Sequence, residues 1–455
     1  MEELRNCAGR RSPWPTFWGD FEEIAGSAFK REPLQDGIAM SQFLKVRTAK
    51  EVLAIIGELA SLSVEWVPLH AAGGRVLASS LRAPEAVPHF DRAVMDGYAV
   101  RARDTFGASE ALPALLETAG EVHMGEIPTR PLEPGTAMAI PTGGMLPPGA
   151  DAVVMLEYTQ SLDERTVEVT RPVAPGDHVL RKGEDIEEGQ SLFAAGTRLR
   201  SQDIGVLAAL GVDQVTAFRK PRVAVFSTGD EVLPVEAQSI PPGKVRDINS
   251  HTLSSHLKQS GFTVSSLPVV PDRLEALVGA SRDALEAHDV VILSGGSSVG
   301  ARDYTLRILS SFPDAELLVH GIAVRPGKPA ILGRIGEKLF WGLPGQPMSA
   351  LMICHTFVMP SLETLEGVRM SSAWRPNRAV ASAVLSRPLP SVQGRTDLFP
   401  VALSSHEAPP LATPLFGKSA MISTLSKADG YVIIPEHVEG LDAGVDVEVH
   451  LFTGR

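Results

Sequence analysis

Glycines, hydroxyl side chains and a carboxylate gather where a buried-looking apolar run ends. The stretch VILSGGSSVGARDY, residues 291–304, passes from an apolar run into a loop of glycine and serine and then reaches Asp303. Backbone N–H groups in such a loop can surround an anion, and the serine hydroxyls add further donors. We therefore predict that this loop binds an anionic group through Ser294, Gly295, Gly296, Ser297, Ser298 and Gly300.

Three further loops have the same character: FSTGDE (226–231), VRPGKP (324–329) and WGLPGQPMSA (341–350). Several anion-binding loops in one region predict a phosphate-bearing ligand. Nearby carboxylates predict a divalent cation, because Mg²⁺ commonly takes one or two carboxylates together with substrate phosphates. The residues predicted to bind the ligand in these loops are Thr228, Gly229, Asp230, Pro326, Gly327, Lys328, Pro344 and Gly345.

Each loop also has a simpler explanation. Asp230 and Asp303 are suitable helix caps, and Lys328 is equally suitable as a solvated surface charge. The sequence contains neither a Walker motif nor a GxGxxG fingerprint, which argues against an ordinary nucleotide hydrolase and a dinucleotide enzyme. The residues alone predict an α/β domain that binds an anionic, phosphorylated small molecule.

The elements around these loops alternate between strand and helix from about residue 220 to residue 370. Apolar strand patterns at 222–227, 263–270 and 289–296 are separated by helical patterns at 249–261 and 272–288. This alternation predicts βαβ units and a parallel sheet, with the ligand at the carboxyl ends of the strands. Further helices are predicted over 47–61, over 347–367 and over 201–212, the last with Ser201 as its N-cap.

The predicted fold class is therefore α/β plus β, in several domains. Short β patterns broken by glycine and proline fill the region before residue 200 and the region after residue 371. We expect a disordered extension over 1–39 and a β-rich domain over 86–179 that is inserted into a first domain. That split first domain is predicted at 40–85 and 180–219, the α/β domain at 220–370 and a C-terminal β-barrel at 371–455.

Composition limits the function classes. The 455 residues carry a formal net charge of −12, which argues against a nucleic-acid binder that neutralises phosphates. Cys7 and Cys354 cannot form a disulfide framework, which fits a cytoplasmic protein. The apolar run LMICHTFVM is too short to span a bilayer, and we expect no membrane partner.

Seven ordered motifs resemble the molybdopterin molybdenumtransferase family, which includes the E domain of gephyrin. They are PHFDRAVMDGYAV, PTGGMLPPGADAVV, RKGEDIEEGQSLFAAGTRL, FSTGDEV, SGGSSVGARDY, RPGKP and GLPGQPMSA, and the likeness runs from about Met40 to the C-terminus. Members of this family take adenylylated molybdopterin, insert molybdate and release AMP with Mg²⁺. The resemblance implies a homodimer whose cleft lies between the α/β domain of one subunit and the second domain of the other. It also implies a molybdopterin adenylyltransferase and molybdoenzymes as partners.

The resemblance also assigns roles to residues in the matching motifs. It implies Glu231 and Asp303 as the metal ligands. Alternatives for two of the carboxylates are a turn residue at Asp185 and a helix N-cap at Asp272. The residues implied in catalysis are Asp96, Thr142, Asp185, Glu231, Asp272, Asp303, Arg325 and Ser419.

The sequence departs from the family pattern in several places. Arg92, Ala93 and Val94 replace the residues that usually precede MDGYA, and Gln346 stands where GLPGNP has asparagine. Arg325 replaces a lysine, which keeps the charge but changes a point donor into a planar fork.

A second family lysine, thought to help bind molybdate, aligns with Gly321, and His320 beside it could compensate if protonated. Two hypotheses of different class follow. The chain is either an active transferase or a non-catalytic molybdopterin-binding carrier or scaffold that has lost the oxyanion site.

Overall fold

A computed structural model describes residues 32–33, 46–295, 300–369, 379–404 and 409–452. The chain divides into two compact units, and each is described by itself. The larger unit comprises Met1–Glu65, Gly74–Val76 and Phe218–Arg455, and the smaller unit comprises Trp66–Gly73 and Leu77–Ala217.

A seven-stranded sheet forms the centre of the larger unit, in the order β1-β19-β21-β22-β18-β14-β17. The four strands from β22 to β17 are parallel, whereas β21, β19 and β1 each pair with their neighbours in antiparallel fashion. Its strands are β1 (Glu32–Pro33), β14 (Arg222–Thr228), β17 (Thr263–Ser266), β18 (Val290–Gly295), β19 (Ala315–His320), β21 (Ile331–Ile335) and β22 (Lys338–Leu343).

The sheet is therefore mixed, where the sequence predicted a parallel one. The reason is local: Ile335 pairs with Lys338 across a turn that contains Gly336 at φ 58°, so β21 returns directly as β22. A two-residue turn of this kind joins antiparallel strands, because parallel neighbours need a longer crossover.

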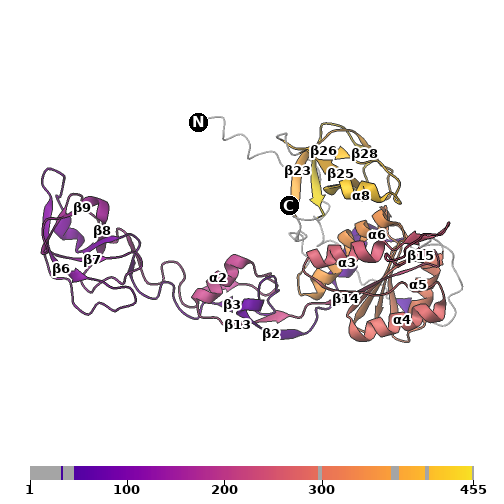
Figure 1. The fold of residues 1–455 in the computed structure, drawn as a ribbon, viewed down its shortest axis with the longest axis horizontal. Coiled ribbons are helices and arrows are strands. Elements are labelled where there is room, and N and C mark those ends of the chain that lie inside the picture. The colour runs from indigo at the N-terminus through magenta and orange to yellow at the C-terminus, as the bar shows by residue number, and fades with distance from the viewer. Residues whose placement is uncertain (1–31, 34–45, 296–299, 370–378, 405–408, 453–455) are drawn as a thin grey trace. The chain divides into compact units, whose positions relative to one another are not determined.

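Helices cover both faces of this sheet because its strands alternate their apolar side chains. On β14, Val223 and Val225 face one layer, and Ala224 and Phe226 face the other. The first layer contains α1 (Ala49–Gly57), α3 (Asn249–Gln259), α6 (Pro347–Ile353), the π-helical turn η5 (Cys354–Val358) and α7 (Met359–Leu365). The second contains α4 (Leu274–Ala287) and α5 (Gly300–Ser310), which lie side by side (Figure 1).

A closed five-stranded β-barrel forms the C-terminal part of the larger unit. Strand β25 pairs with β26 and also with β27, which closes the ring β25-β26-β23-β29-β27. The short strand β20 (Val324–Arg325) joins β25 in parallel, with Arg325 opposite Asp397. The barrel region contains β23 (Val380–Leu385), β24 (Leu389–Pro390), β25 (Thr396–Leu403), β26 (Leu411–Pro414), α8 (Ile422–Lys427), β27 (Gly430–Ile434), β28 (Gly440–Leu441) and β29 (Asp446–Leu451).

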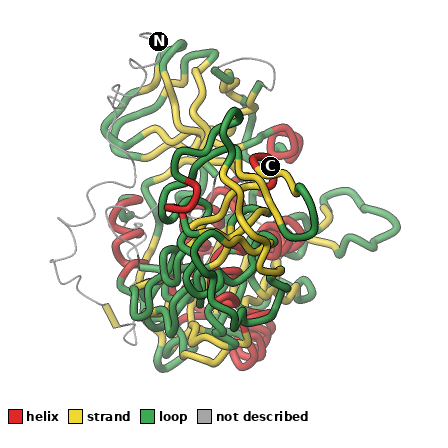
Figure 2. The backbone as a smooth tube through the Cα atoms, turned by 90° about the vertical axis from the view of Figure 1, so that its left-hand side faces the viewer, coloured by secondary structure: helices red, strands yellow, loops and turns green. Residues whose placement is uncertain are grey.

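The smaller unit is built mainly from a six-stranded sheet in the order β8-β5-β7-β6-β10-β9. Loops and turns make up much of the chain between its short strands (Figure 2). The boundary between the two units falls within β2. The strands and the helix of the smaller unit are β2 (Val64–Pro68), β3 (Leu81–Arg82), β4 (Arg92–Ala93), β5 (Gly97–Val100), β6 (Ala114–Glu121), β7 (Thr136–Ile140), β8 (Ala152–Met155), β9 (Thr159–Ser161), β10 (Thr166–Val169), β11 (Val179–Leu180), β12 (Ser191–Phe193), α2 (Ser201–Ala209) and β13 (Gln214–Phe218).

These elements confirm the predicted fold class of an α/β sheet, a β-rich region and a C-terminal barrel. The domain boundaries given in the sequence analysis stay a prediction. The expected helix over 47–61 is α1. Thr48 and Glu51 form a capping box at its N-terminus. The cap predicted at Ser201 was wrong by one position: Arg200 is the N-cap, and its N–H donates to Asp203.

The stretch Pro347–Leu365 is the one helical segment among the described residues that is long and apolar enough to cross a membrane. All of its most apolar window is buried inside the protein. Its side chains pack in the larger unit's core, which explains the apolar composition without a bilayer.

A buried ion pair fixes the start of the sheet. Arg219 donates to both oxygens of Asp289, each at 2.8 Å, and the Arg222 N–H donates to the same carboxylate at 2.8 Å. Burial alone would raise the pKa of Asp289, but the hydrogen bonds from Arg219 and then from Arg222 outweigh it and hold the pKa below its usual value.

Asp289→Asn should therefore lower the free energy of unfolding by about 2 kcal/mol at pH 7. The folded-state pKa is depressed, so this contribution is complete above the unfolded value near pH 4 and disappears as the pH falls further. Urea unfolding of both proteins between pH 7 and pH 3 measures it. The exposed Asp283→Asn is the matched control, and an equal loss in both variants would contradict the assignment.

Candidate functional site

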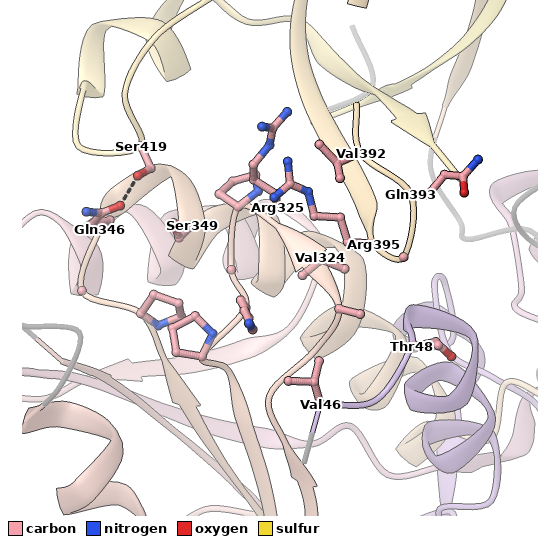
Figure 3. A pocket seen from close by; sticks show the side chains of 18 residues that line it. Val46, Thr48, Val324, Arg325, Gln346, Ser349, Val392, Gln393, Arg395 and Ser419 are labelled. Carbon is pink, nitrogen blue, oxygen red and sulfur yellow. Dashed lines mark hydrogen bonds between the residues drawn. The ribbon is translucent and has the colours of Figure 1, made fainter. Parts of the chain in front are cut away.

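A cavity of about 920 Å³ lies in the larger unit, where the α/β sheet meets the barrel (Figure 3). Its walls come from the segment before α1, the loop after β20, the turn into α6 and two loops of the barrel. The lining residues are Val46, Thr48, Ala323, Val324, Arg325, Pro326, Gly327, Lys328, Pro329, Pro344, Gly345, Gln346, Ser349, Val392, Gln393, Gly394, Arg395 and Ser419.

Two arginines of this cavity share one buried carboxylate. Asp397 is fully buried, and its oxygens lie 2.6 Å from Nη2 of Arg325 and 3.0 Å from Nε of Arg395. The Ser391 hydroxyl donates to the same carboxylate at 3.0 Å. The side chains of Arg325 and Arg395 stay 46% and 33% exposed, so their remaining N–H groups are available to a ligand.

Lys328 adds a third cation to the lining of the cavity. It lies on a loop whose conformation requires glycine at position 327. Gly327 has φ 116°, and a Cβ there would lie 2.4 Å from Cδ1 and Cγ1 of Ile353 on α6. The loop therefore passes directly over the helix and carries Arg325 and Lys328 to the same cavity.

Hydroxyl groups form another part of the wall. Ser349 is buried near the start of α6. Ser419 lies between β26 and α8, and its hydroxyl donates to Oε1 of Gln346. Of the residues predicted for catalysis, the structure brings Arg325 and Ser419 together in this cavity, with Pro326, Gly327, Lys328, Pro344 and Gly345 from the predicted ligand loops.

A hydrogen-bonded network joins the carboxyl ends of the parallel strands. Thr228 at the end of β14 donates to Asp272 at 2.5 Å, and the Asp272 N–H donates to Asp230 at 3.1 Å. Because the Asp272 carboxylate binds Thr228 and the N-cap of α4 is Arg273, the alternative of an N-cap at Asp272 was wrong.

Asn249 continues this network toward the cavity. Its side-chain amide donates to Ser294 Oγ and to the carbonyl of Gly345, both at 2.8 Å. Ser294 in turn donates to the carbonyl of Pro344 at 3.2 Å. Since Pro344 and Gly345 also line the cavity, the strand-end network borders it directly.

The structure describes only some of the other residues predicted to bind the ligand or the metal. Glu231 follows Thr228, Gly229 and Asp230 in the loop after β14, and its carbonyl accepts from Val245 N at 2.9 Å. Gly300 and Asp303 lie on α5, of which only the backbone is described at these positions, and Gly295 ends β18. Gly296, Ser297 and Ser298 lie outside the described residues. Within the described part of the chain, no group of three or more His, Cys, Asp or Glu side chains is arranged to hold a metal ion.

Three predicted catalytic residues belong to the smaller unit. Asp96 accepts the Thr142 N–H at 2.7 Å, although the two are far apart in sequence. This backbone hydrogen bond, and then the Thr142 hydroxyl, hold the pKa of Asp96 below its usual value, so the carboxylate stays ionised. Asp185 is exposed, and its N–H donates to Val87 O at 3.2 Å.

The backbone conformation at position 321 favours glycine. It has φ 90°, and its N–H and carbonyl are bonded to Ala330 and Arg47. A lysine at this position would be strained, because side chains disfavour the left-handed region. His320 beside it lies on β19, paired with Ile331.

Sequence reasoning missed Arg395 and Asp397. The run QGRTDLF places them two positions apart, Arg395 just before β25 and Asp397 within it, but nothing in that run shows that Arg325 is their neighbour. Only the pairing of β20 with β25 brings the three together.

Comparison with known proteins adds family evidence to this geometry. Three family models match: the MoeA N-terminal region (domain I and II) at residues 45–211, a probable molybdopterin binding domain at 224–364 and the MoeA C-terminal region (domain IV) at 382–452. A molybdopterin molybdenumtransferase of Bacillus subtilis is 32% identical over 85% of this chain and 89% of its own length. The chain belongs to the MoeA family. The resemblance drawn from the seven motifs is thereby confirmed.

Other MoeA relatives agree in sequence and structure. Molybdopterin molybdenumtransferase 2 of Mycobacterium tuberculosis is 34% identical over 84% of this chain and 94% of its own length. The crystal structure of a molybdopterin biosynthesis MoeA protein from Pyrococcus horikoshii shares 38% identity with a TM-score of 0.73, and covers 90% of this chain and 100% of its own.

Gly327→Ala should displace the loop that carries Arg325 and Lys328. We expect a loss of about 2–3 kcal/mol in unfolding free energy, since backbone strain at positive φ adds to the clash with Ile353. Gly394→Ala is the matched control, because Gly394 has φ 87° but open space around a Cβ. Chemical denaturation measures both, and an equal loss in the two variants would show that the close approach to Ile353 is unimportant.

Proposed function

We propose that this chain is a molybdopterin molybdenumtransferase, which takes adenylylated molybdopterin and molybdate, forms molybdenum cofactor and releases AMP. The names of the curated relatives support the proposal, and so does the match to a molybdopterin binding domain. The observation that carries it for this chain is the cationic cavity beside the strand-end network.

The cavity has the charge that a tetrahedral oxyanion requires. Arg325, Lys328 and Arg395 line it, and Asp397, the carboxylate paired with both arginines, is fully buried. Molybdate is a dianion, and charge-assisted hydrogen bonds from guanidinium and ammonium groups are the strong ones. Arg395 thus supplies a cation beside Arg325 and Lys328 in a chain that has Gly321 at the position of a family lysine.

The cavity is also large enough for more than the oxyanion. A volume of about 920 Å³ is in the range of sites that enclose a whole cofactor-sized ligand. We place the metal-accepting end of the molybdopterin beside the three cations. Its phosphate end would lie toward the carboxyl ends of the parallel strands, near Thr228, Asp230 and Ser294.

The carboxylates at the strand ends are the kind of ligand that Mg²⁺ takes together with substrate phosphates. Asp230, Glu231 and Asp272 supply carboxylates within the loops after β14 and before α4, and Asp303 lies on α5. We propose that Glu231 and Asp303 hold the ion, with phosphate oxygens of the ligand completing its shell. Bound there, Mg²⁺ would neutralise the charge of the pyrophosphate that is cleaved.

The residues of the smaller unit complete the proposal. The ionised Asp96, fixed by Thr142, is suited to orient a nucleophile or a ligand donor, and Asp185 is exposed to solvent. We propose a cytoplasmic homodimer in which these residues meet the α/β domain of the partner subunit. Molybdopterin adenylyltransferase would deliver the substrate, and molybdoenzymes would receive the product.

Single-turnover reaction of the purified protein with adenylylated molybdopterin tests the function. We expect AMP and molybdenum cofactor to form together, only when both molybdate and Mg²⁺ are present, and EDTA to stop the reaction. Tight molybdopterin binding with no AMP release would contradict the transferase. That result would instead support a non-catalytic molybdopterin-binding carrier. The reason to consider a carrier is that Gly321 stands where the family has a lysine.

Arg395→Gln tests the oxyanion site itself. Loss of a charged donor should raise the Kd for molybdate about ten-fold or more, while Arg325 keeps its partner Asp397. Arg387→Gln, an exposed arginine of the same barrel, should leave the Kd unchanged. Isothermal titration with sodium molybdate measures both. Equal affinities in the wild type and Arg395→Gln would remove this arginine from the site.

A further inference from the structure

Gln346 stands at the N-cap of α6 but does not cap the helix. Its backbone has the extended cap conformation, with φ −76° and ψ 125°, yet its side chain makes no bond to a helix N–H. Short side chains such as asparagine accept from the N–H groups of the first turn, whereas glutamine is one methylene longer and is not among the favoured caps. The amide of Gln346 is therefore directed elsewhere.

That amide reaches the barrel. Oε1 of Gln346 accepts the hydroxyl proton of Ser419, as the dashed line in Figure 3 shows. The Met348 N–H also donates to the Ser419 carbonyl at 3.3 Å. Two bonds thus fasten the Ser419 loop to the start of α6, and both partners of the side-chain bond line the cationic cavity.

This bond determines what Ser419 can offer to a ligand. A serine hydroxyl has one proton and two lone pairs. With the proton donated to Gln346, the hydroxyl has only lone pairs left for a ligand, and these repel an oxyanion, which accepts hydrogen bonds and donates none. Arg325, Lys328 and Arg395 carry no such restriction, because each has several protons.

We propose that Gln346 is a positioning residue that competes with the bound oxyanion for the Ser419 proton. Oxyanion binding then requires the Ser419 hydroxyl to rotate away from Gln346 and toward the anion, which breaks the side-chain bond between the barrel loop and α6. The proposal deepens the oxyanion-binding role of this cavity and rests on that role.

Gln346→Asn tests it with the smallest change. Asparagine is one methylene shorter and prefers to accept from the N–H groups of the first helical turn, so it should release Ser419 and be at least as thermostable as the wild type. Release of the hydroxyl should lower the Kd for molybdate about three- to ten-fold in isothermal titration. Gln259→Asn makes the same chemical change at an exposed position of α3, outside the lining of the cavity, and should leave the Kd unchanged.

A Ser419→Ala background completes the test. There Gln346→Asn should no longer change the Kd, because the proton for which Gln346 competes is absent. An unchanged or weaker affinity in Gln346→Asn, or the same gain with and without Ser419, would overturn the proposal. The effect of Arg395→Gln would still support the site in that case. If no variant and no wild-type protein bound molybdate, the oxyanion site and the role of Gln346 would both fail.

Discussion

The buried carboxylate of Asp397 is the contact on which the candidate site depends. A fully buried charge is tolerated only with partners, and Asp397 has Arg325 at the end of β20 and Arg395 just before its own strand. Holding both guanidinium groups also holds β20 against β25, and so joins the α/β part to the barrel. The same bonds aim the remaining donors of two arginines at one cavity. The arginines thus hold two parts of the structure together and line the cavity at once, which a lysine with its single point charge does less well.

The rest of the site follows from the edge of a parallel sheet. Strands β14, β18 and β22 end at the same side, so Thr228, Ser294 and the turn at Pro344 come together without any local signal that links them. Their polar groups satisfy one another through Asp272, Asp230 and Asn249. Glycine is required where this edge meets α6, because the Gly327 loop leaves no room for a side chain.

Much of this was predictable from the sequence, because the signals are local. The apolar runs at β14 and β18 and the glycine loops after them predicted a sheet and its ligand edge, and ordered motifs predicted the family. Two features were beyond reach because they depend on tertiary pairing. The pairing of β20 with β25 brings Arg395 to Arg325, and the N-cap position of Gln346 sends its amide to Ser419. The turn at Gly336, which makes β21 antiparallel to β22, is local but was not predicted.

The central claim is that the cavity around Arg325, Lys328 and Arg395 holds the oxyanion. The most direct measurement is anomalous diffraction at the molybdenum edge from crystals soaked in molybdate. The account predicts a single strong peak within hydrogen-bond distance of these three side chains, and its loss in Arg395→Gln crystals. A peak elsewhere in the molecule, with this cavity empty and the cofactor-forming reaction intact, would contradict the account.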